Sequence, residues 1–108
     1  MKEHKIVPQR VVILHRLAAR EARQAERYYR KSSLMIAQRF RQAVTEVIER
    51  IGRAAEQGSP YLQHLRWMQL RRFPYLLFYE IRDPLPVMVY AIAHTSRRPG
   101  YWRGRRTP

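Results

Sequence analysis

The chain has 108 residues, 45% of them hydrophobic, and its 22 Lys and Arg against 8 Asp and Glu give a formal net charge of +14. This length fits one domain over residues 1–108 that buries its own apolar core, with flexible ends expected at 1–9 and 104–108. The lack of cysteine excludes disulfides and metal–thiolate sites, and no apolar run approaches the roughly 18 residues of a membrane span, so a soluble, cytoplasmic protein is expected.

The first half of the chain predicts a strand and then a helix. Residues 11–14 (VVIL) form a short, mostly β-branched run, which is typical of a strand. From Ala18 onward the apolar residues recur at helical spacing. The resulting stripe is mostly small and favours close packing against another helix; it consists of Ala18, Ala22, Ala25 and Tyr29.

A second helix follows a short interruption. Ser32 and Ser33 break the first helical pattern, and either can cap the next helix. A new apolar stripe then continues for about five turns, until residues 57–60 end it: Ala37, Phe40, Val44, Val47 and Ile51. Two helices joined by about two residues should fold back as an antiparallel hairpin.

The second half of the chain predicts three strands. Residues 65–73, 75–81 and 86–93 are rich in aromatic and β-branched residues, with breaks at Pro74 and at Asp83-Pro84. The short connections indicate a three-stranded antiparallel meander. The fold class expected is therefore α+β in the order β-α-α-β-β-β, with the helix hairpin covering one face of the sheet.

Metal, cofactor and acid–base chemistry receive little support from the sequence. No glycine-rich phosphate loop is present, so no cofactor is expected. The histidines are scattered and do not have the spacing of metal ligands: His4, His15, His64 and His94. Most acidic residues fall among arginines in the predicted helices, where surface ion pairs are the ordinary interpretation: Glu21, Glu26, Glu46, Glu49 and Glu56.

The basic balance predicts an acidic partner, which is nucleic acid, an anionic membrane surface or an acidic protein. The densest basic segment is residues 94–106, where five arginines surround Tyr101 and Trp102 after a Pro99-Gly100 turn. Such arginines bind phosphates or carboxylates, and such aromatic rings stack on bases. Alternatively, the rings pack against the core and the arginines extend into solvent. Arg71 and Arg72, on a neighbouring predicted strand, extend the same patch.

Four segments occur in an order that matches a known family: Tyr28-Tyr29, Arg39-Phe40, Arg72-Phe73-Pro74-Tyr75 leading into Leu77-Phe78-Tyr79, and His94-x-x-Arg97-x-Pro99-x-Tyr101-Trp102. With the order of predicted elements, they make residues 10–106 resemble the RelE/ParE family of bacterial toxins from type II toxin–antitoxin systems. The resemblance implies a small, basic α+β toxin that a tightly bound acidic antitoxin holds inactive. It implies no cofactor and no membrane partner.

The family has two branches, which differ in target. RelE-type members are ribosome-dependent messenger RNA endonucleases that use basic residues on the sheet and a C-terminal tyrosine or histidine. The positions that match most of those basic residues are Trp67, Gln69, Leu76 and Thr95. The residues left for such catalysis are Arg71, His94, Arg97 and Tyr101. The sequence therefore looks more like the ParE branch, whose members poison DNA gyrase by binding.

The resemblance and the charge pattern together predict two protein-binding surfaces. The arginines expected to face an acidic antitoxin lie on the helix hairpin: Arg20, Arg23, Arg27 and Arg41. The residues expected to bind the target are Arg71, Arg72, Arg97, Arg98, Tyr101, Trp102 and Arg103. The alternatives are a RelE-like nuclease that acts on messenger RNA in the ribosome, and a basic nucleic-acid-binding module outside the toxin families.

Overall fold

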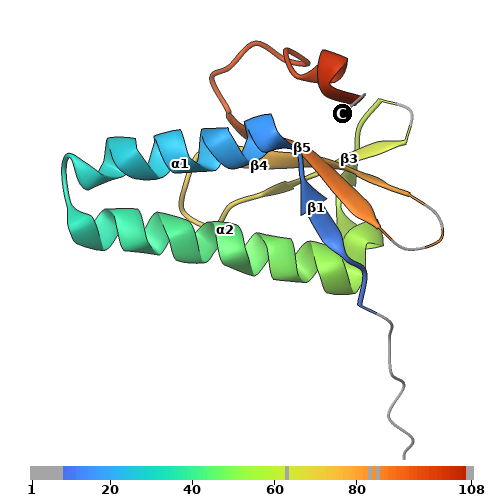
Figure 1. Cartoon of the computed structure of the whole chain (residues 1–108), viewed down its shortest axis with the longest axis horizontal. Helices are drawn as coiled ribbons and strands as arrows, with labels where there is room; N and C mark the ends of the chain where they lie inside the picture. The colour runs from blue at the N-terminus through green and yellow to red at the C-terminus, as the bar shows by residue number, and fades with distance from the viewer. Residues whose placement is uncertain (1–8, 63, 83, 85, 107–108) are drawn as a thin grey trace, which may run out of the picture.

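A computed structural model describes residues 9–62, 64–82, 84 and 86–106. Within these residues the protein is a five-stranded sheet with a hairpin of two long helices on one face (Figure 1). The elements, in chain order, are β1 (Val12–Leu14), α1 (Arg16–Arg30), α2 (Leu34–Ala54), the 3₁₀ helix η1 (Ala55–Gln57), β2 (Ser59–Pro60), β3 (Leu65–Gln69), β4 (Tyr75–Ile81), β5 (Val87–His94) and the 3₁₀ helix η2 (Arg103–Arg106).

Both long helices begin at a side-chain cap. The hydroxyl of Ser33 accepts the Ile36 N–H at 3.3 Å, so the capping role predicted for the Ser32-Ser33 break is confirmed for Ser33. The α1 helix begins earlier than Ala18, because Nδ1 of His15 accepts the Leu17 N–H at 3.1 Å and ends the strand there. No described helix has the length and apolar character that a membrane crossing requires.

The main core lies between the helix hairpin and the sheet. The predicted stripe of α2 is buried there against alternate residues of β4 and β5, including Leu77 and Val89. At the hairpin end an aromatic cluster closes this core: the rings of Tyr29 and Phe40 lie 5.3 Å apart, and the Phe40 ring lies 5.2 Å from those of Phe73 and Tyr75. The helical spacing therefore identified the buried faces correctly.

The sheet has the strand order β1-β5-β4-β3-β2. The predicted meander is confirmed, because β3, β4 and β5 pair antiparallel in sequence order. β1 lies parallel to β5, so the sheet is mixed. A β-bulge interrupts the β4–β5 ladder: Tyr79 pairs with Val89 and Phe78 with Ala91, which leaves Tyr90 as the extra residue. Tyr90 and Ala91 consequently both contribute to the outer face of the sheet, which is turned away from the helices.

The structure differs from prediction at two strands and at one end of the chain. A further strand, β2, pairs with β3; its two residues, one of them Pro60, are too few to show a pattern, and proline suits the edge position that β2 takes. β3 ends at Gln69 instead of residue 73, so Arg71 and Arg72 lie in a turn; Arg72 has a φ of +67°. Of the two ends expected to be flexible, residues 1–8 and 107–108 lie outside the described residues, whereas 104–106 form most of η2.

Candidate functional site

The segment after β5 folds back over the outer face of the sheet. It turns at His94–Gly100, where the Arg97 N–H binds the His94 carbonyl at 2.9 Å and Gly100 has a φ of +75°. Trp102 then stacks on Phe78, with ring centroids 4.7 Å apart, and lies nearly parallel to Tyr90 at 6.3 Å. Only 1% of Trp102 is exposed. Trp102, which we expected in the target-binding set, is therefore packed against the outer face of the sheet and holds the tail there.

A cavity of about 260 Å³ lies between this tail and the sheet, and we call it the tail pocket. Its sheet side is largely apolar and aromatic, formed by Tyr61, Trp67, Leu76, Phe78 and Ala93. Its tail side carries the polar and basic groups, formed by His94, Thr95, Arg97, Arg98, Pro99, Gly100, Tyr101 and Trp102. Arg97 and Arg98 are exposed. The tail pocket is therefore an apolar cavity with a basic margin, an arrangement suited to an apolar group that carries or adjoins negative charge.

The tail is anchored to α1 by a carboxylate. Glu21 accepts hydrogen bonds from both terminal nitrogens of Arg105, at 2.9 and 3.0 Å, from the Tyr101 hydroxyl at 2.5 Å, and from the Ile92 N–H at 3.0 Å. The side chains of Glu21 and Arg105 are 12% and 15% exposed. The interpretation of Glu21 as an ordinary helix-surface acid is therefore wrong, because its partners come from β5 and the tail.

Tyr101 is held between two cations. The guanidinium of Arg97 lies 4.0 Å from the centre of its ring, and that of Arg105 lies 5.2 Å from it. Burial, and then the hydrogen bond to Glu21, raise the pKa of the Tyr101 phenol well above its usual value. The hydroxyl therefore keeps its proton at neutral pH and donates a hydrogen bond to Glu21. A protonated phenol of this kind is unsuited to act as a general base.

His94 lies at the edge of the tail pocket, with its ring 5.1 Å from that of Tyr75 in an edge-to-face arrangement. Its Nδ1 accepts the Ser96 N–H at 3.0 Å and lies 2.7 Å from the Ser96 hydroxyl. Because Nδ1 is an acceptor, the neutral ring carries its proton on Nε2. Nε2 is then a hydrogen-bond donor.

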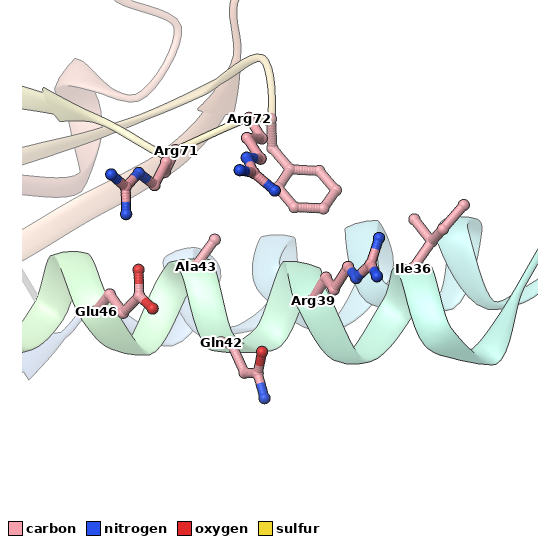
Figure 2. A pocket seen from close by; sticks show the side chains of 8 residues that line it. Ile36, Arg39, Gln42, Ala43, Glu46, Arg71 and Arg72 are labelled. Carbon is pink, nitrogen blue, oxygen red and sulfur yellow. The ribbon is translucent and has the colours of Figure 1, made fainter.

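The structure separates the predicted target-binding residues. Arg97, Arg98, Tyr101 and Trp102 line the tail pocket, whereas Arg103 is exposed at the start of η2 and is not part of the lining. Arg71 and Arg72 line a different cavity, beside α2. They therefore do not extend the tail patch as expected, because β3 ends before them and the turn directs them toward the helix (Figure 2).

The nuclease positions divide in the same way. Of the four catalytic candidates, His94, Arg97 and Tyr101 come together at the tail pocket, but Arg71 does not. Among the positions that match the nuclease's basic residues, three line the pocket with neutral side chains: Trp67, Leu76 and Thr95. No group of three or more His, Cys, Asp or Glu that could hold a metal ion occurs in the described part of the chain.

Three of the four arginines predicted to face an antitoxin line a groove between α1 and α2, which we call the hairpin groove. Arg23, Arg27 and Arg41 line it, together with Glu26 and Arg30, while Arg20 is exposed on α1 outside the lining. Arg41 is already bonded to Glu26 at 2.8 and 3.1 Å, and Arg30 binds the same carboxylate at 2.8 Å. These hydrogen bonds, that of Arg41 first, lower the pKa of Glu26. Arg23 and Arg27 have no such partner among the described residues.

Sequence reasoning missed Glu21 and Arg105 as a pair, and Arg39 as a neighbour of Arg71 and Arg72. The sequence around Glu21 shows only an acid in a basic helix, so no local signal indicates its long-range partners. Arg39 was noted only for its place in a family-like segment. Its position on the face of α2 next to the β3–β4 turn depends on how the hairpin lies over the sheet.

Comparisons with known proteins agree with this architecture. A family model described as "ParE toxin of type II toxin-antitoxin system, parDE" matches residues 12–99. A solved structure described as "Chromosomal ParDE TA system from P. aeruginosa" aligns with a TM-score of 0.67 at 16% sequence identity, over 80% of this chain and 96% of that chain. At this identity the structural likeness shows the fold alone. A comparison with curated proteins finds no match.

Proposed function

Since the chain belongs to the ParE toxin family of type II toxin–antitoxin systems, we propose that it inhibits growth by binding a protein target and that a cognate acidic antitoxin neutralises it. DNA gyrase is the target that the ParE-like resemblance implies. The toxin, the antitoxin and this target would meet in the cytoplasm.

The residues that line the tail pocket are the observation that supports a binding function rather than a catalytic one. Cleavage of RNA through a 2′-hydroxyl needs a proton acceptor beside that hydroxyl and cations beside the phosphate. The sheet side of the pocket offers Trp67, Leu76 and Phe78 instead of cations. Tyr101 is the residue that would act as the base, but its pKa is raised and its hydroxyl donates a hydrogen bond to Glu21. An apolar pocket with Arg97 and Arg98 at its margin suits an anchoring side chain of a protein target.

The hairpin groove supports the antitoxin half of the proposal. Arg23 and Arg27 are exposed and lie one helical turn apart on α1, where a carboxylate-bearing helix or strand could pair with both. Glu26 partly neutralises Arg30 and Arg41. The charge available to an antitoxin therefore comes chiefly from α1.

A pair of assays on the purified protein tests the proposal. Supercoiling by DNA gyrase should be inhibited, and a translation extract programmed with a defined messenger RNA should leave that RNA uncut. The tail variant R97A/R98A, which keeps Tyr101 and Glu21, serves as the matched control and should not inhibit gyrase. Growth arrest without an effect on gyrase would keep the toxin assignment but replace the target.

A RelE-like nuclease remains the second candidate because His94, Arg97 and Tyr101 meet at one end of the tail pocket. In that case the transcript would be cut in the ribosomal A site. The cut would disappear in H94A or Y101F, and it would not need Arg71, which lines another cavity. Such cleavage would replace the binding mechanism.

A further inference from the structure

A second basic cleft lies between α2 and the turn that joins β3 to β4. It encloses about 450 Å³ and is lined by Ile36, Arg39, Ala43 and Glu46 of α2 and by Arg71 and Arg72 of the turn. Figure 2 shows the side chains of Arg71 and Arg72 directed from the turn toward α2, while the Arg39 side chain extends along the helix toward Ile36. Gln42 points away from this space. We call this region the α2 cleft.

The arginines of the α2 cleft have no carboxylate partner among the described residues. Arg39, Arg71 and Arg72 form no ion pair with any residue that the structure describes, although Arg30, Arg41 and Arg105 elsewhere are all paired with glutamates. Glu46 contributes one negative charge to the lining but forms no ion pair there. Three guanidinium groups against the one carboxylate of Glu46 leave the lining with an excess of two positive charges, which attracts anions. The α2 cleft therefore favours a ligand with two or more negative charges.

The backbone at Arg72 is a second, independent feature. Its φ of +67° lies in the left-handed region, which is unfavourable for a residue with a Cβ atom by about 1 kcal/mol or more. This conformation turns the chain into β4 and places two consecutive arginines over α2. Glycine would make the same turn without strain but would bring no cation. Strained residues of this kind concentrate at binding sites.

The α2 cleft continues into exposed apolar residues at the start of α2. Ile36, in the lining, is 38% exposed, and the neighbouring Leu34 and Met35 are each 59% exposed. An exposed aliphatic group beside a charged one is typical of a protein interface. A nucleic-acid backbone would make no use of the aliphatic end.

We propose that the α2 cleft binds an acidic, amphipathic segment of a protein partner. Its carboxylates pair with Arg39, Arg71 and Arg72, and its apolar side chains cover Ile36 and the exposed start of α2. This mode corresponds to an amphipathic helix laid in a groove. The proposal concerns a surface separate from the tail pocket and from the hairpin groove, and it holds whichever target the toxin has.

The position of Arg41 shows that the two helix surfaces are separate. It follows Arg39 by two residues, which places it about 200° further around the helix. Arg41 faces α1 in the hairpin groove, whereas Arg39 faces the β3–β4 turn. The two clefts therefore lie on opposite flanks of α2, and a segment in the α2 cleft leaves Arg23 and Arg27 accessible.

The test uses a labelled synthetic helix with glutamates on one face and leucines on the other, whose binding to the full chain is followed by fluorescence anisotropy. The cleft variant is R39Q/R71Q/R72Q. The matched control is R16Q/R50Q/R53Q, which removes the same charge from exposed arginines that lie outside the α2 cleft and form no ion pair with another described residue. Binding should weaken about tenfold or more in the cleft variant and less than about threefold in the control.

Two further measurements identify the occupant. Amide shifts of the labelled protein on addition of the acidic helix should concentrate at Ile36, Ala43 and Phe73, and a helix with serine in place of leucine should bind more weakly. Equal weakening in both triple variants would reduce the effect to general charge attraction and overturn the proposal. A second outcome would also overturn the proposal. In it, a single-stranded oligo-dT binds the chain and loses affinity in the cleft variant, whereas the acidic helix binds the cleft variant and the natural chain equally well.

Discussion

The carboxylate of Glu21 on α1 receives two parallel hydrogen bonds from the guanidinium of Arg105 in η2, at 2.9 and 3.0 Å, across 84 positions of the sequence. The pair lies where β1 has ended and β5 continues. Glu21 accepts the Ile92 N–H at 3.0 Å, and Arg105 donates to the Tyr90 carbonyl at 3.1 Å. The two side chains thus bind the backbone of β5 beyond the last residue of β1, so they stabilise the sheet edge as well as the tail.

The first prediction follows from this pair. E21Q keeps the shape of the side chain but leaves the mostly buried Arg105 without its counter-charge. We expect a loss of about 2 kcal/mol in the free energy of unfolding, the usual range for hydrogen bonds to charged groups. Urea unfolding followed by circular dichroism measures the loss. E49Q is the control, because Glu49 is exposed on α2 and has no ion pair within the described part of the chain. Identical midpoints for the two variants would show that the pair contributes nothing to stability.

The second prediction concerns a close approach of the backbone to a buried tyrosine. A Cβ atom on Gly58 would lie 1.9 Å from the Tyr79 hydroxyl oxygen, and that hydroxyl is hydrogen-bonded to the Ala55 carbonyl at 2.5 Å. Gly58 has a φ of −64°, which alanine adopts readily, so only the steric conflict should matter. G58A should lose about 1 to 3 kcal/mol of stability.

The control for this substitution is G104A, whose added Cβ would meet nothing within 4 Å. Adding Y79F to G58A removes the clashing oxygen, so the double variant should lose less than the sum of the two single losses. Thermal unfolding of the four proteins measures this coupling. Strictly additive losses would mean that Gly58 is not constrained by the Tyr79 hydroxyl.

The sequence predicted best those features that repeat along an element. Every residue of the α2 stripe, such as Phe40 or Ile51, reports the same buried face, so the helix was recognisable without its partner. The meander was recognisable for the same reason. β2 was not, because two residues cannot show a period, and Glu21 was not, because its partners are fixed only when α1, β5 and the tail meet.

The candidate site shows the same limit. Arg71 and Arg97 belong to one basic composition, but they line different cavities, because the β3–β4 turn directs Arg71 toward α2 while the tail crosses the other face of the sheet. Composition predicts that basic surface exists. Only the topology decides which arginines share a partner.

The third prediction is a dependence of stability on alkaline pH. The pKa of Tyr101 is raised in the folded protein, by burial and by its bond to Glu21, and burial raises the pKa of Tyr75 to about 12. The folded state therefore holds these protons more tightly than the unfolded state, whose tyrosines titrate near pH 10. The resulting stabilisation is complete below about pH 10 and is lost as the pH rises toward the folded-state values.

Urea unfolding between about pH 9 and pH 12 checks this expectation, because it covers the range above the ordinary tyrosine pKa. The free energy of unfolding should be level at first and then fall. Y101F lacks one of the titrating groups, so its decline should be shallower than that of the natural chain, whatever its stability at neutral pH. Parallel declines in the two proteins would contradict the role assigned to the Tyr101 proton.

The fourth prediction concerns the antitoxin. Reversing the two unpaired arginines of the hairpin groove, in R23E/R27E, should weaken binding of the cognate antitoxin at least about tenfold, because carboxylates would then meet carboxylates. R50E/R53E changes the net charge equally at exposed positions outside that groove. Calorimetric titration gives both affinities. Equal affinities in the two variants would move the antitoxin away from the hairpin groove.

The last prediction separates the function of the tail from its packing. Arg97 and Arg98 are exposed at the margin of the tail pocket, and neither forms an ion pair with another described residue. R97A/R98A should therefore abolish growth arrest on induced expression while it leaves the folding of the chain and its binding to the antitoxin largely intact. Arg97 also lies over the Tyr101 ring at 4.0 Å, so a small loss of stability, below about 1 kcal/mol, is expected.

W102A, in contrast, removes a ring that is 1% exposed and stacked on Phe78, and it should lose about 3 to 5 kcal/mol of stability together with toxicity. Growth curves, thermal unfolding and antitoxin pull-down on each variant give the comparison. If R97A/R98A kept full toxicity, the tail would be a structural clamp on the sheet, and the target would have to be sought at Arg71 and Arg72 in the α2 cleft.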